Sequence, residues 1–457
     1  MVPYSVPMGY ESLKAVLLHT DPSLRFKISQ RFPKIRLIEK KVPLKIQSLA
    51  LSDFTTTVNR AYYTLAVYRQ LRPKEMPQRM NWRHVSCDVD QYGFEIPNSS
   101  SPILNGDVSF RTENTAPWGN AVHRRRDTEA REQHLQLSLR LYEDALAKLN
   151  QLESEGKTVE EFLAGPMTAD DQRISYIVKL RKDELQKCIN EYRNDLLPFH
   201  CRRNNLSSPF TYFIQLSCTQ GYVKTIQRYK YNHKLYEAAK KLNEVLFANR
   251  PVIIVNDFQS RRHIDVWRLP VGLRISANSI SACCGEYEKM VPIIPILDAS
   301  KKLRNVDFSV TSGGDSNYEH RFVKNAQQLS IRANNGRINH LVRAFKTMEN
   351  QQINIGFNVN HTSPYDYFQL LKGWMSTERS VGSVITFELR TERIGEEILE
   401  MVRSQNERTM RRERWVKVVL RNGTILKVSY WGLNVKRWPR FVLTAIIQKA
   451  WNSRKDN

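Results

Sequence analysis

The sequence contains no apolar run long enough to cross a membrane, since no window approaches the 18 consecutive apolar residues that a spanning helix needs. Its first eleven residues, MVPYSVPMGYE, have neither a basic segment nor an apolar core, so we expect no secretory signal. These two absences predict a cytoplasmic or nuclear protein with no membrane partner.

Cysteine is scarce, with six residues in 457, at positions 87, 188, 201, 218, 283 and 284. None forms a C-x-x-C pair, and the adjacent Cys283 and Cys284 have poor geometry for an ordinary disulfide. We therefore expect reduced thiols. One possible metal site has a spacing that matches no known zinc finger and is set aside. Its ligands would be His200, Cys201, Cys218 and His233.

Catalytic signatures are also missing. The sequence has no G-x-G-x-x-G, no G-x-x-x-x-G-K-[ST], no G-x-S-x-G and no H-E-x-x-H. These absences argue against a nucleotide-binding loop, a serine hydrolase and a zinc protease. We expect no catalytic residues, no metal and no cofactor, and therefore a protein that is not an enzyme.

Positive charge is in excess, and the formal net charge is +24. Residues 1–85 carry 15 Lys and Arg against 5 Asp and Glu, whereas residues 121–197 carry 13 against 15. An uneven basic surface suggests an acidic partner, which is nucleic acid, acidic lipid or an acidic protein. The alternative is a soluble protein with a surface rich in Lys and Arg.

Residues 327–420 repeat one unit, a short apolar strand followed by an amphipathic helix. In 353–359 and 384–389 apolar residues alternate with polar ones, which is typical of half-buried strands. A unit of this size cannot bury its own apolar face and must stack on its copies. We therefore predict a leucine-rich-repeat-like array that offers a binding surface. Its strands would centre on Leu329, Ile355, Ile385 and Val418.

The remaining segments predict an α/β protein in four parts. Residues 1–45 form a small helical head, in which Asp21 caps a helix that starts at Pro22. Residues 46–120 are a β-rich segment. Residues 121–200 are a charged helical connector, or else a helical insertion packed on its neighbours. Residues 201–457 hold the array, which starts with a hairpin that turns near Gln220 and Gly221.

The C-terminal end of the array is predicted to be a hairpin and a helix. Asn422 and Gly423 stand between the apolar runs of 418–428 and predict a type I′ turn. The last helix is expected to run from Trp438 to Trp451. Four aromatic residues nearby are either core or an exposed target-binding cluster. They are Trp415, Tyr430, Trp431 and Trp438.

Three groups of segments carry a family resemblance. They are YESLKAVL (10–17) with SLRFKISQRFPKIRLIEK (23–40) and PLKI (43–46), then RYKYNHKLYEAAKKL (228–242) with VLFANRP (245–251), then KNAQQLSI (324–331) with LLKGW (370–374). With these segments the chain resembles the nematode F-box C family, which joins an F-box-like N-terminus to an associated domain of unknown function. The family usually has a cysteine where this chain has Phe32.

The resemblance implies a substrate receptor of a ubiquitin ligase. The N-terminal helices would dock a Skp1-like adaptor, which is acidic, and the array would select an unknown target protein. The adaptor-binding residues would be Leu13, Val16, Leu17, Leu24, Ile28 and Phe32. The alternatives are that these residues pack against the chain's own β-rich segment and that the array has no ligase connection. A second alternative is a basic nucleic-acid-binding protein, which we do not favour, because the basic clusters at 123–126 and 411–415 accompany no known nucleic-acid motif.

Overall fold

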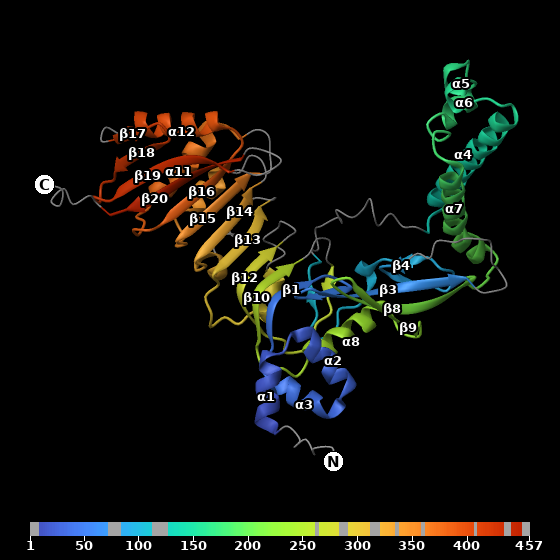
Figure 1. Cartoon of the computed structure of the whole chain (residues 1–457), viewed down its shortest axis with the longest axis horizontal. Coiled ribbons are helices and arrows are strands. Elements are labelled where there is room, and N and C mark those ends of the chain that lie inside the picture. Colours follow the sequence, from blue (N-terminus) through green and yellow to red (C-terminus); the bar gives the residue numbers. More distant parts are fainter. Residues whose placement is uncertain are drawn as a thin grey trace, which may run out of the picture. The chain divides into compact units, whose positions relative to one another are not determined.

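Figure 1 shows the computed structural model, which describes residues 9–71, 84–111, 127–260, 265–282, 291–310, 320–333, 338–357, 362–405, 409–433 and 440–449. The fold is mixed α/β, as the sequence predicts, and it divides into two compact units. The first unit falls within residues 1–62, 104–110 and 243–457, and the second within 63–103 and 111–242.

The first unit begins with three short helices, α1 (Tyr10–His19), α2 (Pro22–Arg31) and α3 (Pro33–Lys41). Asp21 caps α2 as predicted, because its carboxylate accepts the Ser23 N–H at 2.9 Å, and Pro22 occupies the first turn, where a missing N–H has no effect. Pro33 cannot continue α2, so it starts α3 instead.

A buried ion triad holds α2 and α3 against the rest of the first unit. Glu39 in α3 accepts a hydrogen bond from Arg25 Nε at 2.9 Å and two from Arg250, at 2.7 and 2.9 Å. The three side chains are at most 1% exposed. Arg25 also donates to the carbonyls of Val42 and Pro43, at 2.9 and 2.8 Å. Burial lowers the pKa of Arg25, and the charge of Glu39 opposes this shift.

Seven parallel strands form the main sheet of the first unit, among the residues described. Each of these strands pairs in parallel with the strand that follows it in the order given next. They are β1 (Lys45–Leu51), β10 (Ile253–Ser260), β12 (Ile275–Ala282), β13 (Asn305–Val310), β14 (Gln328–Ala333), β15 (Gln352–Phe357) and β16 (Val384–Leu389). Short elements complete the start of this unit: β2 (Thr55–Val58), antiparallel to β1, and β7 (Val108–Ser109), paired with β11 (Val266–Trp267).

The sheet register explains the apolar alternation in the sequence. Val306, Leu329, Ile353 and Ile385 pair across β13 to β16, at spacings of 23, 24 and 32 residues. All four are fully buried. The connecting helices supply the other half of this core, with Leu370 and Trp374 of α11 also fully buried. The helices after α3 in this unit are α8 (Leu235–Phe247, entering from the second unit), α9 (Arg321–Lys324), α10 (Ile338–Ala344), α11 (Pro364–Met375) and α12 (Glu392–Ser404).

The C-terminal end is antiparallel, and here three predictions are wrong. The strand at Val418 is antiparallel to its neighbours, so it is not a fourth copy of the parallel unit. The expected last helix is a strand over its described part. The Asn422–Gly423 hairpin is present, but only Gly423 has a positive φ, of 77°. The Gly423 N–H bonds to the Leu420 carbonyl at 3.0 Å, so the turn is a three-residue loop and not type I′.

Four strands make this end, in the spatial order β17, β18, β19, β20. They are β17 (Thr409–Arg412), β18 (Trp415–Val419), β19 (Ile425–Leu433) and β20 (Arg440–Gln448). β20 lies antiparallel to β16 and thereby joins this end to the parallel strands. A strand forms at 440–448 because alternate residues Leu443, Ala445 and Ile447 are buried, which is a period of two.

The second unit contains a small antiparallel sheet and a helical part. The sheet order is β3 (Ala61–Leu71, mostly in this unit), β8 (Phe210–Gln220) and β9 (Val223–Lys230), with β4 (His84–Val85) on β3 and a separate pair of β5 (Asp88–Val89) and β6 (Glu95–Ile96). The helical part contains α4 (Glu129–Ser154), α5 (Val159–Ala164), α6 (Ala169–Ile174) and α7 (Lys182–Arg203). Ion pairs join α4 to α7 in antiparallel order, and one of them is Glu143–Arg193 at 2.6 Å.

Replacing Glu39 by Gln should lower the free energy of unfolding by about 3–5 kcal/mol, because two guanidinium groups then stay buried without their counter-ion. Urea denaturation followed by tryptophan fluorescence measures this change. The matched control is Glu11→Gln in α1, whose carboxylate pairs with Lys14 but is 81% exposed and should change stability by less than about 1 kcal/mol. Equal effects of the two substitutions would contradict the role of the triad.

Candidate functional site

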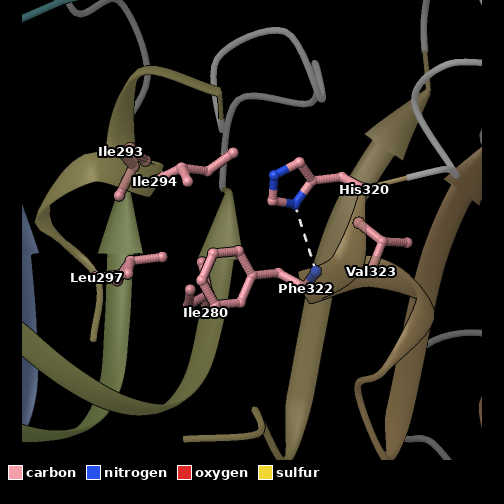
Figure 2. Close-up of a pocket in the computed structure, with 7 residues that line it drawn as sticks. All are labelled: Ile280, Ile293, Ile294, Leu297, His320, Phe322 and Val323. Carbon is pink, nitrogen blue, oxygen red and sulfur yellow. Dashed lines mark hydrogen bonds between the residues drawn. The ribbon is translucent and has the colours of Figure 1, made fainter. Parts of the chain in front are cut away.

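The pocket in Figure 2 lies on the first unit and is too small for a substrate. Its volume is about 10 Å³, which is at the lower limit for one water. The Phe322 N–H donates to His320 Nδ1 at 3.3 Å, and burial, with the charge of Arg321, lowers the pKa of His320. This pocket is therefore a packing defect of the core. The residues that line it are Ile280, Ile293, Ile294, Leu297, His320, Phe322 and Val323.

The N-terminal helices offer a better candidate, which is an open apolar surface on α2. Leu24 is 50% exposed and Phe32, the residue that follows α2, is 57% exposed. Ile28 lies between them and is half-buried. These residues are four apart, so they follow one side of the helix. We call Leu24, Ile28 and Phe32 the α2 stripe.

The opposite side of α2 is fully used inside the protein. Arg25 belongs to the buried triad, Phe26 is 3% exposed, and Ser29 is also buried. The Phe26 ring meets the Phe247 ring edge-on, with centroids 6.4 Å apart. Because one side of α2 is anchored in the core, the α2 stripe keeps its orientation and its exposure. An exposed, ordered apolar surface of this kind is typical of a docking site.

The α2 stripe lies in a basic environment. Lys27 and Arg31 are exposed and follow Leu24 and Ile28 by three residues, so each lies one turn from the stripe. Lys34, in the first turn of α3, is exposed as well. A partner that covers the stripe would therefore meet positive charge at its border. Acidic proteins fit this pattern best.

The six predicted adaptor-binding residues divide between surface and core. Besides the α2 stripe, Val16 is 49% exposed and Leu13 is half-buried. Leu17 is 1% exposed and belongs to the core of the first unit, so it cannot contact a partner directly. Sequence reasoning missed Leu37 in α3, which is 74% exposed. The exposure of Leu37 could not be predicted, because three of the four residues 35–38 are apolar. Such a run does not reveal which side of α3 is buried.

A second exposed surface is the open side of the parallel sheet. Here Ser330, Asn354 and Thr386 lie side by side on β14, β15 and β16. Thr386 Oγ1 donates to Asn354 Oδ1 at 2.6 Å, and Asn354 Nδ2 donates to Ser330 Oγ at 3.4 Å. On the preceding strand, burial raises the pKa of Asp307, although Arg332 at 3.4 Å opposes the shift. This side is polar and open to hydrogen bonding, whereas the side under the helices is apolar.

The predicted aromatic cluster is only partly on this open side. Trp431 is 42% exposed and Trp415 is half-buried, with Lys417 and Lys427 at 5.4 and 6.0 Å from its ring. Tyr430 is 3% exposed, because its side chain points to the other face of β19. Trp438 lies outside the described residues.

Tyr430 is buried because α12 has a glycine at the contact point. A Cβ atom on Gly395 would lie 2.8 Å from Tyr430 Cγ, so only glycine lets the helix approach the ring this closely. Burial also raises the pKa of Tyr430. Sequence analysis could not assign the tyrosine to the core, because residues 430 and 431 are both aromatic and only the strand register separates them.

The described residues show neither a metal site nor a membrane span. Within those ranges no three His, Cys, Asp or Glu side chains are grouped so that they could hold a metal ion. Among the same residues, no helix has the length and apolar character that a membrane crossing requires.

The geometry describes a mixed α/β protein with two open surfaces, and one family model matches part of the chain. A model described as a domain of unknown function (DUF3557) matches residues 234–391. This segment runs from the start of α8 to the residues after β16, so it covers β10 to β16 and leaves out the N-terminal helices and β17 to β20. Neither the curated proteins nor the solved structures contain a match to the chain.

Substitution of the two adjacent aromatic residues separates core from surface. Tyr430→Ala should lower the free energy of unfolding by about 3–5 kcal/mol, because it removes a buried ring and leaves a cavity against Gly395. Trp431→Ala should lower it by a clearly smaller amount, since this residue is 42% exposed and the substitution leaves no enclosed cavity. Chemical denaturation of both variants measures the difference. A larger loss for Trp431→Ala would contradict the assignment of the two sides of β19.

Proposed function

We propose that this protein is a non-enzymatic F-box-type substrate receptor that links a target protein to a Skp1–cullin ubiquitin ligase. The observation that carries the proposal is the α2 stripe. Leu24 and Phe32 are about half exposed although the opposite side of α2 is anchored by the buried triad. The same helix therefore has one side for the protein's own core and one side available to a partner. This arrangement favours adaptor docking over the alternative in which the predicted residues pack only within the chain.

The chemistry of the α2 stripe suits a Skp1-like adaptor. Apolar residues at helical spacing are the anchors of helix-in-groove recognition. Lys27, Arg31 and Lys34 surround them with positive charge, and Skp1-like proteins are acidic. Opposite charge at the border of an interface increases the association rate and the specificity. The apolar anchors would then supply most of the affinity.

The remainder of the first unit would select the target. The strand–helix units of 253–389 support a leucine-rich-repeat-like array, because consecutive parallel strands alternate with connecting segments and share one core. Its open side presents hydroxyl and amide groups, such as those of Ser330, Asn354 and Thr386, and Trp431 lies on the same side near the C-terminal end. Such a surface binds a protein through hydrogen bonds with an aromatic anchor. Ubiquitin transfer would be carried out by other subunits.

Adaptor binding should depend on the α2 stripe in the full-length chain. Leu24→Glu and Phe32→Glu should each weaken binding of a purified Skp1-like protein at least tenfold, because a buried carboxylate replaces an apolar anchor and opposes an acidic partner. Isothermal titration calorimetry measures the Kd. The matched control is Leu206→Glu, since Leu206 is also 50% exposed but lies in the second unit. Melting temperatures of all three variants should stay close to that of the unmodified protein.

Leu17→Lys serves as the opposite control. Leu17 is buried, so this substitution should unfold the N-terminal helices and remove binding together with stability. If the unmodified protein shows no binding at tens of micromolar, the ligase role is wrong and the array is an interaction module without a ligase connection. Equal loss of binding in Leu24→Glu and Leu206→Glu would also contradict the proposal.

Nucleic-acid binding is the second candidate, and one observation favours it. Trp415, Lys417 and Lys427 lie together on the open side of β18 and β19, and a ring beside two ammonium groups suits a base and its phosphates. Arg414 of the basic cluster at 411–415 is already paired with Glu392 at 2.9 Å. Residues 123–126 lie outside the described residues.

The salt dependence of binding tests this second candidate. If the protein binds nucleic acid, the affinity for a labelled oligothymidylate should fall steeply between about 50 and 200 mM salt, because phosphate contacts release counter-ions. Lys427→Ala should weaken that binding and make the dependence on salt less steep. Fluorescence anisotropy gives both quantities. Affinity that does not change with salt, or no binding at low salt, excludes this candidate.

A further inference from the structure

Strand β9 is the exposed edge of the sheet in the second unit. The sheet order ends in β3, β8 and β9, so β9 has a neighbour on one side only (Figure 1). All eight of its residues are exposed, which is unusual for a strand in a folded protein. They include apolar side chains, with Val223 at 67%, Ile226 at 46% and Tyr229 at 54% exposure. Natural proteins normally cover, shorten or interrupt an edge of this kind, or place charged side chains on it.

The hairpin turn determines which backbone groups of β9 are directed outward. Gly221 and Tyr222 form a two-residue loop, and Gly221 has a φ of 60°. The pair that flanks such a loop, Gln220 and Val223, is hydrogen-bonded, and bonded pairs then alternate along the ladder. The backbone groups of Val223, Thr225, Gln227 and Tyr229 therefore bond to β8. Those of Lys224, Ile226 and Arg228 face outward, and within the described residues no hydrogen bond to them from outside the hairpin is found.

The two faces of β9 differ in charge. Lys224, Arg228 and Lys230 share the face that also carries Ile226. Arg228 is held in place, since its guanidinium lies 3.8 Å from the centre of the Tyr68 ring and its Nε donates to Gln215 at 2.9 Å. The other face carries Val223, Thr225, Gln227 and Tyr229, which are apolar or neutral. Residues 222–234 contain no Asp or Glu at all.

The positive charge along this edge affects a neighbouring group. Burial lowers the pKa of His84 in β4, and the charges of Lys224 and Arg228 lower it further. His84 Nδ1 lies 3.5 Å from Gln215 Nε2, so the histidine is on the same side as Arg228. The positive potential of this edge therefore extends to residues of the neighbouring strand β4.

Charge also excludes pairing of β9 with itself. Two copies related by a two-fold axis would place Lys224, Arg228 and Lys230 of one strand beside the same basic residues of the other. Like charges directly opposite each other destabilise a strand pair. Because the edge has no acidic residue that could compensate, a second copy of this chain is disfavoured and an acidic strand is favoured.

We propose that β9 takes an extended acidic segment of a partner protein as an added strand. Main-chain hydrogen bonds to Lys224, Ile226 and Arg228 would supply affinity, and the alternation of the two faces would supply specificity. The preferred segment alternates acidic side chains, which lie beside Lys224, Arg228 and Lys230, with apolar side chains, which lie beside Val223 and Tyr229. This inference does not depend on adaptor docking, since no N-terminal residue takes part.

The test uses the full-length chain and a fluorescein-labelled peptide of eight residues that alternates glutamate with valine. Fluorescence anisotropy should show saturable binding. Ile226→Pro should weaken it at least tenfold, because it removes an outward N–H, while a proline at this edge position leaves the pairing with β8 intact. Lys224→Glu combined with Lys230→Glu should weaken it about tenfold at low salt and less at high salt. The matched control for charge is Lys346→Glu combined with Lys372→Glu, two exposed lysines of the first unit.

A second test modifies the peptide and keeps the protein unmodified, so its result does not depend on whether a protein variant folds. N-methylation of one alternate set of peptide nitrogens should abolish binding to the unmodified protein, and methylation of the other set should leave it unchanged, because only alternate N–H groups face β9. If both methylated peptides bind equally well, or if binding survives Ile226→Pro, strand addition is wrong. An oligothymidylate that competes fully with the peptide and is insensitive to Ile226→Pro would show an unspecific basic surface instead, and would overturn the proposal.

Discussion

The carboxylate of Glu39 pairs with two buried guanidinium groups, and the architecture of the first unit depends on this contact. Arg25 comes from α2, whereas Arg250 is 211 residues further along the chain than Glu39 and lies just before the parallel strand β10. The triad therefore joins an N-terminal segment to the start of the sheet across the whole insertion that forms the second unit. A buried charge cluster costs desolvation, so it adds orientation more than stability. Its geometric requirements fix α2 and α3, and they leave Leu24 and Phe32 at the surface.

A second constraint is that each parallel strand must be covered on one side only. Val306, Leu329, Ile353 and Ile385 occupy the covered side and form one continuous apolar layer. The residues that follow them along the strands, Asp307, Ser330, Asn354 and Thr386, face the other way. The side chains of Ser330, Asn354 and Thr386 hydrogen-bond across the strands. The repeat thereby produces a buried layer and an open polar surface from the same alternation. Because one alternation gives both sides of the strand, each added unit extends the buried apolar layer and the open polar surface together.

Residue patterns predicted much of this arrangement. The alternation in 353–359 and 384–389 located β15 and β16, and the Asp21–Pro22 pair located the start of α2. Strand direction was not predictable, because parallel and antiparallel strands show the same period of two. The strand at Val418 therefore looked like a further repeat although it is antiparallel. The triad was hidden for a different reason, since Arg25 and Glu39 are residues that rarely lie in a core unless they are paired, and their partner is remote in sequence.

Sequence patterns were equally unable to predict which of the candidate docking residues are exposed. Leu17 and Val16 are neighbours with similar side chains, yet one is buried and the other is half exposed. Helical spacing identifies which residues share a side, but only the packing of α1 to α3 shows which side faces inward. The edge strand β9 was recognisable as part of a hairpin, whereas its position at the edge depends on β3, a strand distant in sequence, which pairs with the other side of β8.

The antiparallel placement of β20 against β16 has a consequence for how this chain can vary in length. A strand of opposite direction occupies the position that another parallel unit would take, and it is itself held between β16 and β19. Growth by duplication at the C-terminal side is therefore blocked. A further parallel unit could join the sheet only internally, between β10 and β16, and β17 to β20 would still end the sheet.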